Sequence, residues 1–109
     1  MRQLRFIVNE QIIKADPNCD FSGIGPGTEG YLQVEFSFSP EWNGCVKAAK
    51  FSSTMGKEYE TVILKDGKSC MIPAEALKFR SFRIRLLGRR DNFTLTTNYV
   101  TVRQDGGKS

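Results

Sequence analysis

The chain has 109 residues, of which 39% are hydrophobic and 26% charged, and its formal net charge is +4. This length suits a single domain with a sizeable core, and the composition is that of a globular protein rather than a disordered one. No run of eighteen apolar residues is present and the N-terminal residues lack the features of a signal peptide, so we expect no membrane association and assembly in a cytoplasm.

The hydrophobic pattern alternates with period two along most of the chain. Residues 3–8 and 31–38 show it most clearly, and such alternation predicts half-buried β-strands. Further strands are predicted at residues 45–53, 58–64, 81–88 and 92–102. The side chains expected in the core along these strands are Phe36, Phe38, Phe51, Ile84 and Leu86.

Turn residues separate the predicted strands, and Asp66-Gly67 is the strongest candidate for a two-residue hairpin. Only residues 73–78 suit a helix, as one short turn with Pro73 at its first position. About seven strands with turns about eight to twelve residues apart predict an all-β, immunoglobulin-like antiparallel β-sandwich. We assign residues 1–103 to this single domain and residues 104–109 to a flexible polar tail.

The sequence lacks the residues of most catalytic and metal sites. Histidine is absent, which excludes Ser-His and Cys-His nucleophile pairs and metal sites that contain histidine. Cys19, Cys45 and Cys70 are odd in number and widely spaced, which favours reduced thiols over disulfides or zinc. Glu58 and Glu60 alternate on one strand, where carboxylates are usually solvated rather than catalytic. We therefore expect no enzymatic activity, no cofactor and no metal.

Residues 23–30 contain a literal G-x-G-x-x-G pattern at Gly25, Gly27 and Gly30. A phosphate-binding loop of this kind follows a strand and opens a helix, whose N-terminus holds the pyrophosphate. Here a predicted strand follows the glycines instead. We therefore interpret this segment as a crossing loop of the sandwich and not as a nucleotide site.

Basic residues gather late in the chain, with no acidic residue between Lys78 and Asp91. Within this run, a candidate surface for an acidic protein or a nucleic acid consists of Arg83, Arg85, Arg89 and Arg90. Proteins that bind single strands interleave such cations with exposed aromatic side chains, whereas Phe79 and Phe82 are expected in or near the core. Nucleic acid is therefore the less favoured partner, and a solvated strand face is the simplest interpretation.

Trp42, the only tryptophan, lies in the segment FSFSPEWNG, residues 36–44. Its ring would most economically close one end of the core, with the indole N–H donating to a backbone carbonyl. The alternative is a contact of Trp42 and Tyr31 with a ligand at the end loops.

Several short motifs follow one another in a familiar order: Phe36 to Trp42, Lys47 to Phe51, Asp66 to Leu77, Gly88, and Thr96 to Asn98. Together they resemble a small domain of virion proteins of tailed phages of Gram-positive bacteria, over roughly residues 30 to 103. The resemblance implies an immunoglobulin-like sandwich on a phage particle, in the tail, baseplate, fibre or head decoration. It also implies that Cys70 faces the core from a hairpin strand.

We therefore expect a non-enzymatic virion module, assembled in the host cytoplasm, that binds other virion proteins. One alternative is a module that binds host glycans or cell walls, which requires solvent-facing aromatic side chains among Tyr31, Trp42, Tyr59 and Tyr99. Another is a small nucleic-acid-binding or regulatory protein that uses residues 83–90, with binding that weakens steeply as salt rises.

Overall fold

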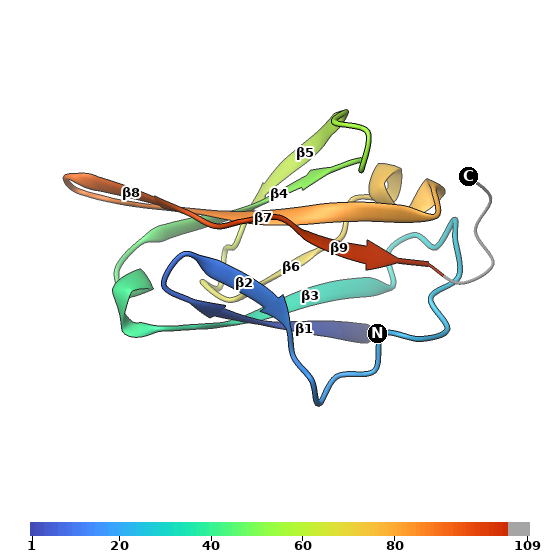
Figure 1. The fold of residues 1–109 in the computed structure, drawn as a ribbon, viewed down its shortest axis with the longest axis horizontal. Coiled ribbons are helices and arrows are strands. Elements are labelled where there is room, and N and C mark those ends of the chain that lie inside the picture. The colour runs from blue at the N-terminus through green and yellow to red at the C-terminus, as the bar shows by residue number, and fades with distance from the viewer. Residues whose placement is uncertain (105–109) are drawn as a thin grey trace.

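The computed structural model describes residues 1–104, which form two β-sheets packed face to face (Figure 1). The four-stranded sheet has the order β2-β1-β3-β6, from β2 (Ile12–Ala15), β1 (Arg2–Asn9), β3 (Leu32–Phe38) and β6 (Ser69–Met71). The five-stranded sheet has the order β5-β4-β7-β8, with β9 also paired to β7, from β5 (Glu58–Ile63), β4 (Val46–Ser52), β7 (Ser81–Arg90), β8 (Phe93–Thr96) and β9 (Val100–Arg103). The predicted all-β sandwich is confirmed.

The core lies between the two sheets and follows the alternation of the sequence. Four of the expected core side chains, Phe36, Phe51, Ile84 and Leu86, are buried there. Phe38 is half-buried at the margin of the core, where its ring centroid lies 5.2 Å from that of Trp42. The strands β3 and β7 thus each bury alternate side chains on one face, as period-two patterning requires.

The strand count and one strand direction differ from the expectation of about seven antiparallel strands. Nine strands are present within residues 1–104, and β1 pairs with β3 in parallel, from Arg2 opposite Leu32 to Val8 opposite Phe38. The loop of residues 16–31 makes this possible, because it carries the chain from the end of β2 to the start of β3, which lies beside the start of β1. The glycine-rich segment belongs to this crossing loop, as expected.

The predicted two-residue hairpin at Asp66-Gly67 is wrong. A turn does form, since the N–H of Gly67 donates to the carbonyl of Leu64 at 3.0 Å. However, this turn carries the chain from β5 in one sheet to β6 in the other, where β6 pairs with β3. Turn residues determine a local reversal of the chain but not which strands pair afterwards. Cys70 does face the core, from β6, but not as part of a hairpin.

Two 3₁₀ turns interrupt the strands, η1 (Pro40–Trp42) and η2 (Ala74–Lys78). The second is the predicted helical turn, although Pro73 precedes it as the cap instead of occupying its first position. No helix in the described part of the chain is long and apolar enough to cross a membrane.

The folded part of the chain extends beyond its predicted end. Gln104, expected in the tail, is buried, and its backbone N–H donates to the carbonyl of Arg80 at 2.6 Å. Its side-chain amide also donates to the carbonyl of Phe79. Local polarity predicts a tail, but the carbonyls of Phe79 and Arg80, just before β7, hold this residue. The rest of the expected tail, residues 105–109, lies outside the described residues.

Candidate functional site: the basic face of the five-stranded sheet

Alternation along β7 positions the predicted arginines. Phe82, Ile84 and Leu86 point into the core, so the side chains between them point outward. Arg83, Arg85 and Arg89 therefore share the outer face of the five-stranded sheet. The structure thus brings together three of the four arginines that the sequence singled out.

Tyr99, which precedes β9, organises the centre of this face. The guanidinium carbon of Arg83 lies 4.1 Å from the centroid of the Tyr99 ring, and that of Arg85 lies 5.5 Å away. Cation–π contacts of this kind contribute about 0.5–1 kcal/mol each at exposed sites. The Nε atoms of both arginines are buried and lack a hydrogen-bond partner within residues 1–104. Tyr99 therefore holds two cations in fixed positions on the sheet.

No carboxylate of the described residues forms an ion pair with Arg83 or Arg85. Lys50 of β4 lies opposite Arg85 in the sheet. Its charge is neutralised, because its ammonium lies 2.5 Å from the carboxylate of Glu58. The hydrogen bond and the charge of Lys50 hold the pKa of Glu58 below its usual value. The positive charge of the two stacked arginines is thus not balanced by an ion pair within residues 1–104.

The rest of the face combines another cation with apolar side chains. Arg103 pairs with Ser81 in the register of β9 and β7, so it is exposed on the arginine side. Ile63 of β5 and Leu87 of β7 flank Ala48 in one row across the sheet, and Ile63 is exposed. We use the name basic face for the set Arg83, Arg85, Arg89, Tyr99 and Arg103.

Arg90 does not belong to the basic face, contrary to the sequence-based grouping. Its guanidinium donates to the carbonyl of Asn43 at 2.6 Å and lies 4.8 Å from the centroid of the Phe93 ring. As the neighbour of Arg89 on a strand, it points to the opposite side of the sheet. Arg90 therefore fastens the β7–β8 hairpin to the η1 turn.

Trp42 is fully buried and closes one end of the sandwich. Its indole N–H donates to the carbonyl of Glu10 at 2.7 Å, and the N–H of Glu10 donates to Ser39 Oγ at 2.8 Å. A Cβ placed on Gly88 would lie 2.5 Å from the Trp42 ring, so only glycine gives the ring room on β7. The segment FSFSPEWNG thus ties η1 to the β1–β2 turn, and Trp42 is not available to a ligand.

The other aromatic candidates do not form a stacking platform. Tyr31 is 52% exposed. Tyr59 is half-buried against the core, and Tyr99 is half-buried beneath the arginines. Sugar-binding sandwiches of the kind considered above need exposed aromatic rings side by side, and these three lie on different elements.

The Thr96 to Asn98 motif has a structural use. Thr97 Oγ1 accepts from the N–H of Leu86 at 3.0 Å and is buried. The side chain of Asn98 accepts from the N–H of Ile13 at 2.9 Å and donates to the carbonyl of the same residue at 3.3 Å. Because β2 belongs to the other sheet, this motif links the two sheets.

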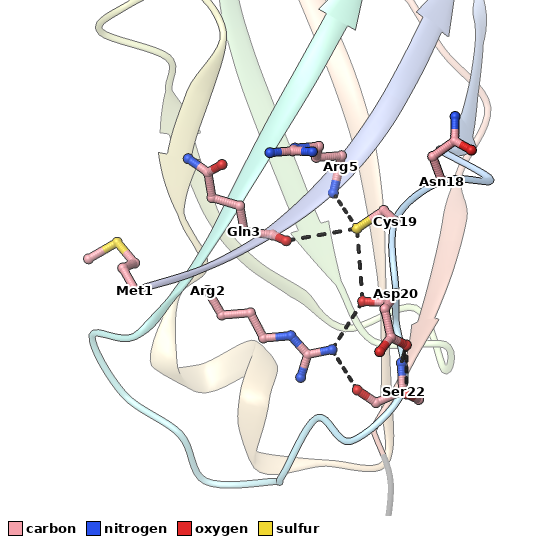
Figure 2. Close-up of a pocket in the computed structure, with 8 residues that line it drawn as sticks. All are labelled: Met1, Arg2, Gln3, Arg5, Asn18, Cys19, Asp20 and Ser22. Carbon is pink, nitrogen blue, oxygen red and sulfur yellow. Dashed lines mark hydrogen bonds between the residues drawn. The ribbon is translucent and has the colours of Figure 1, made fainter.

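A polar cavity of about 540 Å³ opens beside the N-terminus (Figure 2). Arg2 donates from its guanidinium to the carbonyls of Asp20 at 3.0 Å and Ser22 at 2.5 Å. Cys19 Sγ accepts from the N–H of Arg5 at 3.3 Å, in the place that a neighbouring strand would occupy. These hydrogen bonds join β1 to the crossing loop. We therefore interpret this region as the attachment of the loop to the sheet and not as a ligand site.

The thiols and carboxylates do not form a reactive cluster. All three cysteines are unpaired, and burial raises the pKa of the Cys70 thiol to about 12, which keeps it protonated and unreactive. Within residues 1–104, no three cysteine, aspartate or glutamate side chains are grouped so that they would hold a metal ion.

No family model matches the chain, and neither a curated protein nor a solved structure matches it.

Proposed function

We propose that the chain is a non-enzymatic binding module of a phage virion, which docks through its basic face onto an acidic surface of another virion protein. The observation that carries this proposal is the stack of Arg83 and Arg85 on Tyr99, which has no carboxylate partner in the described residues. The virion itself is proposed from the resemblance of residues 30–103 to phage domains.

The energetics of the stack favour an acidic partner. Immobilising a long side chain on binding costs about 0.5–1.5 kcal/mol of conformational entropy. Because Arg83 and Arg85 are already stacked on Tyr99, they lose less of this freedom when a partner binds. Their buried Nε atoms face little water, so part of the desolvation cost has also been met. Complementary charge also speeds docking and favours the correct partner over others.

The arrangement supports the two alternatives less well. A glycan module would use exposed aromatic rings, and Trp42 is buried. A single-strand binder would stack bases on Tyr99, but Arg83 already covers that ring at 4.1 Å. A protein surface rich in carboxylates needs no free aromatic face, and it would also contact the exposed Ile63 beside the arginines.

The test is binding of the labelled chain to phage particles prepared without it, with host cell walls as a second target. A variant with Arg83, Arg85 and Arg89 all replaced by glutamine should bind particles at least about tenfold more weakly, which is about 1.4 kcal/mol. The matched control replaces three exposed lysines elsewhere, Lys14, Lys65 and Lys68, and removes the same charge. This control should bind like the unchanged chain.

Equal weakening in both variants would mean that only net charge matters, and it would contradict a specific basic face. Binding to cell walls that soluble glycans displace would favour the adhesin alternative. Binding to DNA or RNA that falls steeply with salt would favour the nucleic-acid alternative. If neither particles nor walls bind the chain, the virion proposal is wrong.

A further inference from the structure

An apolar cleft of about 430 Å³ opens at the end of the five-stranded sheet, away from Trp42. It lies between the β4–β5 turn and the segment that joins η2 to β7, both of which are in the upper right part of Figure 1. Met55 and Phe79 form its apolar walls together with Tyr59, and Met55 is 92% and Phe79 48% exposed. A smaller hollow shares Tyr59 and Phe79 with it.

Both walls are held in place by hydrogen bonds between their backbone groups and neighbouring polar side chains. Ser53 Oγ accepts from the N–H of Met55 at 3.2 Å and from the N–H of Lys57 at 2.9 Å, which fixes the turn. On the other side, the carbonyl of Phe79 accepts from the side-chain amide of Gln104. The cleft is therefore already formed, while its two large apolar side chains are left in solvent, as in surfaces that bind partners.

The charges around the cleft have one prevailing sign. Among residues 1–104, Lys57, Lys78 and Arg80 line the cleft and the adjoining hollow, with Glu75 as the one carboxylate. Ser81, which also lines the cleft, lies two residues before Arg83 on the outer side of β7. The positive charge thus continues from the cleft onto the basic face.

We infer that this cleft takes one apolar side chain from an acidic segment of the partner protein, whose carboxylates lie beside Lys57 and Lys78 and continue toward Arg83. The inference rests on the proposed function, because it assigns the same acidic partner an apolar anchor. Anchors of this kind dominate the affinity of many interfaces, while the surrounding charges select the partner.

Other occupants fit less well. Residues 105–109 of the chain read DGGKS and contain no large apolar side chain to fill the cleft. A second copy that met this cleft with its own would bring Lys57 and Lys78 against their equivalents, and such like-charge contact is unfavourable.

The experiment uses the whole chain with ¹³C-labelled methionine methyl groups. Met55 is one of three methionines, and Met1 and Met71 lie outside the cleft as internal controls. The probe is a short synthetic peptide with a central leucine flanked by aspartates and glutamates. Two further peptides replace the leucine with alanine, or the acids with their amides. Amide signals of Arg83, Arg85 and Tyr99 report the basic face in the same titration.

We expect the Met55 methyl signal to shift saturably with the acidic leucine peptide and the other two methionines to stay unchanged. Removing most of the leucine side chain should weaken binding about tenfold, and replacing the acids should weaken it about as much. Met55→Ser should give the same loss. Ile12→Ser, which changes an exposed apolar side chain of β2, is the matched control and should have no effect.

The opposite results separate the two proposals. If the acidic peptides shift the basic face but not the Met55 methyl group, the cleft inference is wrong and the proposed function stands. If they shift neither, both are wrong. Equal affinity for the neutral peptide would overturn the acidic character of the partner. A Met55 response to vesicles of anionic lipid, with none to the peptides, would overturn the inference in favour of a membrane surface.

Discussion

The two ends of the sandwich each carry large side chains in a turn, but they use them differently. At one end Trp42 is 0% exposed, lies on Gly88, and donates from its indole N–H to the carbonyl of Glu10. At the other end Met55 and Phe79 face solvent beside a cleft. An aromatic residue in a turn is therefore not assigned to the core or to a ligand site by its position in the turn alone. Trp42 is buried because Gly88 leaves space for its ring and the carbonyl of Glu10 accepts from its indole N–H.

This contrast shows that the only tryptophan of the sequence belongs to the core. Trp42 stabilises the fold by filling space that Gly88 leaves open. At the other end Phe79 stays 48% exposed on the wall of the cleft, so its apolar surface is available for binding. Two sets of substitutions, at Trp42 and Phe79 and at Gly88, test this contrast, and a third set concerns the turn after β5.

The largest effect is expected from Trp42→Ala, which should lower the free energy of unfolding by about 3–5 kcal/mol because it leaves a cavity in the core. Phe79→Ala at the open end should cost less than about 1 kcal/mol. Urea unfolding followed by circular dichroism measures both. Similar losses at the two ends would remove the contrast. If Trp42→Ala does not fold, Trp42→Phe should give a smaller loss in the same direction.

Gly88→Ala should cost about 1–3 kcal/mol, because its new Cβ would lie 2.5 Å from Trp42 Cζ3 and 2.7 Å from Cε3. In a Trp42→Leu background the same change should cost less, and this coupling is read from a double-mutant cycle. Gly25→Ala is the matched control, since no atom lies within 4 Å of a Cβ added there. Purely additive losses would show that Gly88 is not needed for the Trp42 ring.

The smallest effect concerns Asp66, in the turn after β5. Hydrogen bonds from the Ser69 hydroxyl and from the N–H groups of Lys68 and Ser69 lower the pKa of Asp66 from 3.8 to about 2. Because the folded state lowers this pKa, the stabilisation is present above about pH 4 and is lost as the pH falls through about 2. The carboxylate is well solvated, so the gain is small.

Urea midpoints between about pH 2 and 6 measure this dependence, and Asp66→Asn should remove the Asp66 share of it. Ser69→Ala, which removes the hydrogen bond with the largest influence on the pKa, should remove part of that share. An unchanged pH profile in both variants would show that the turn does not depend on the charge of Asp66.

Much of the fold is predictable because side-chain alternation is local. The strands at residues 32–38 and 81–90 bury the side chains that period two assigns to the core. The same alternation places Arg83 and Arg85 outward. The position of Trp42 in a turn between two strands predicts that its ring closes one end of the core. These features depend on neighbours in the sequence, so the sequence alone determines them.

The sequence does not predict the partners that strands and side chains find across the sandwich. The crossing of the Asp66-Gly67 turn between sheets, the parallel pairing of β1 and β3, and the hydrogen bond of Arg90 with Asn43 depend on how distant segments pack. A methionine in the otherwise polar turn STMGK was the one sequence signal of the cleft. The cleft itself could not be predicted, because its other apolar wall, Phe79, comes from a distant segment of the chain.

The sequence is therefore enough to predict the β-sandwich, its inward and outward side chains and the lack of histidine chemistry. Only the packed fold shows that Tyr99 stacks on Arg83, that Arg90 binds Asn43, and that Met55 and Phe79 line one cleft. The physical reason is range. Alternation is set by each strand's own backbone, whereas these contacts join residues whose proximity exists only once both sheets have packed around one core.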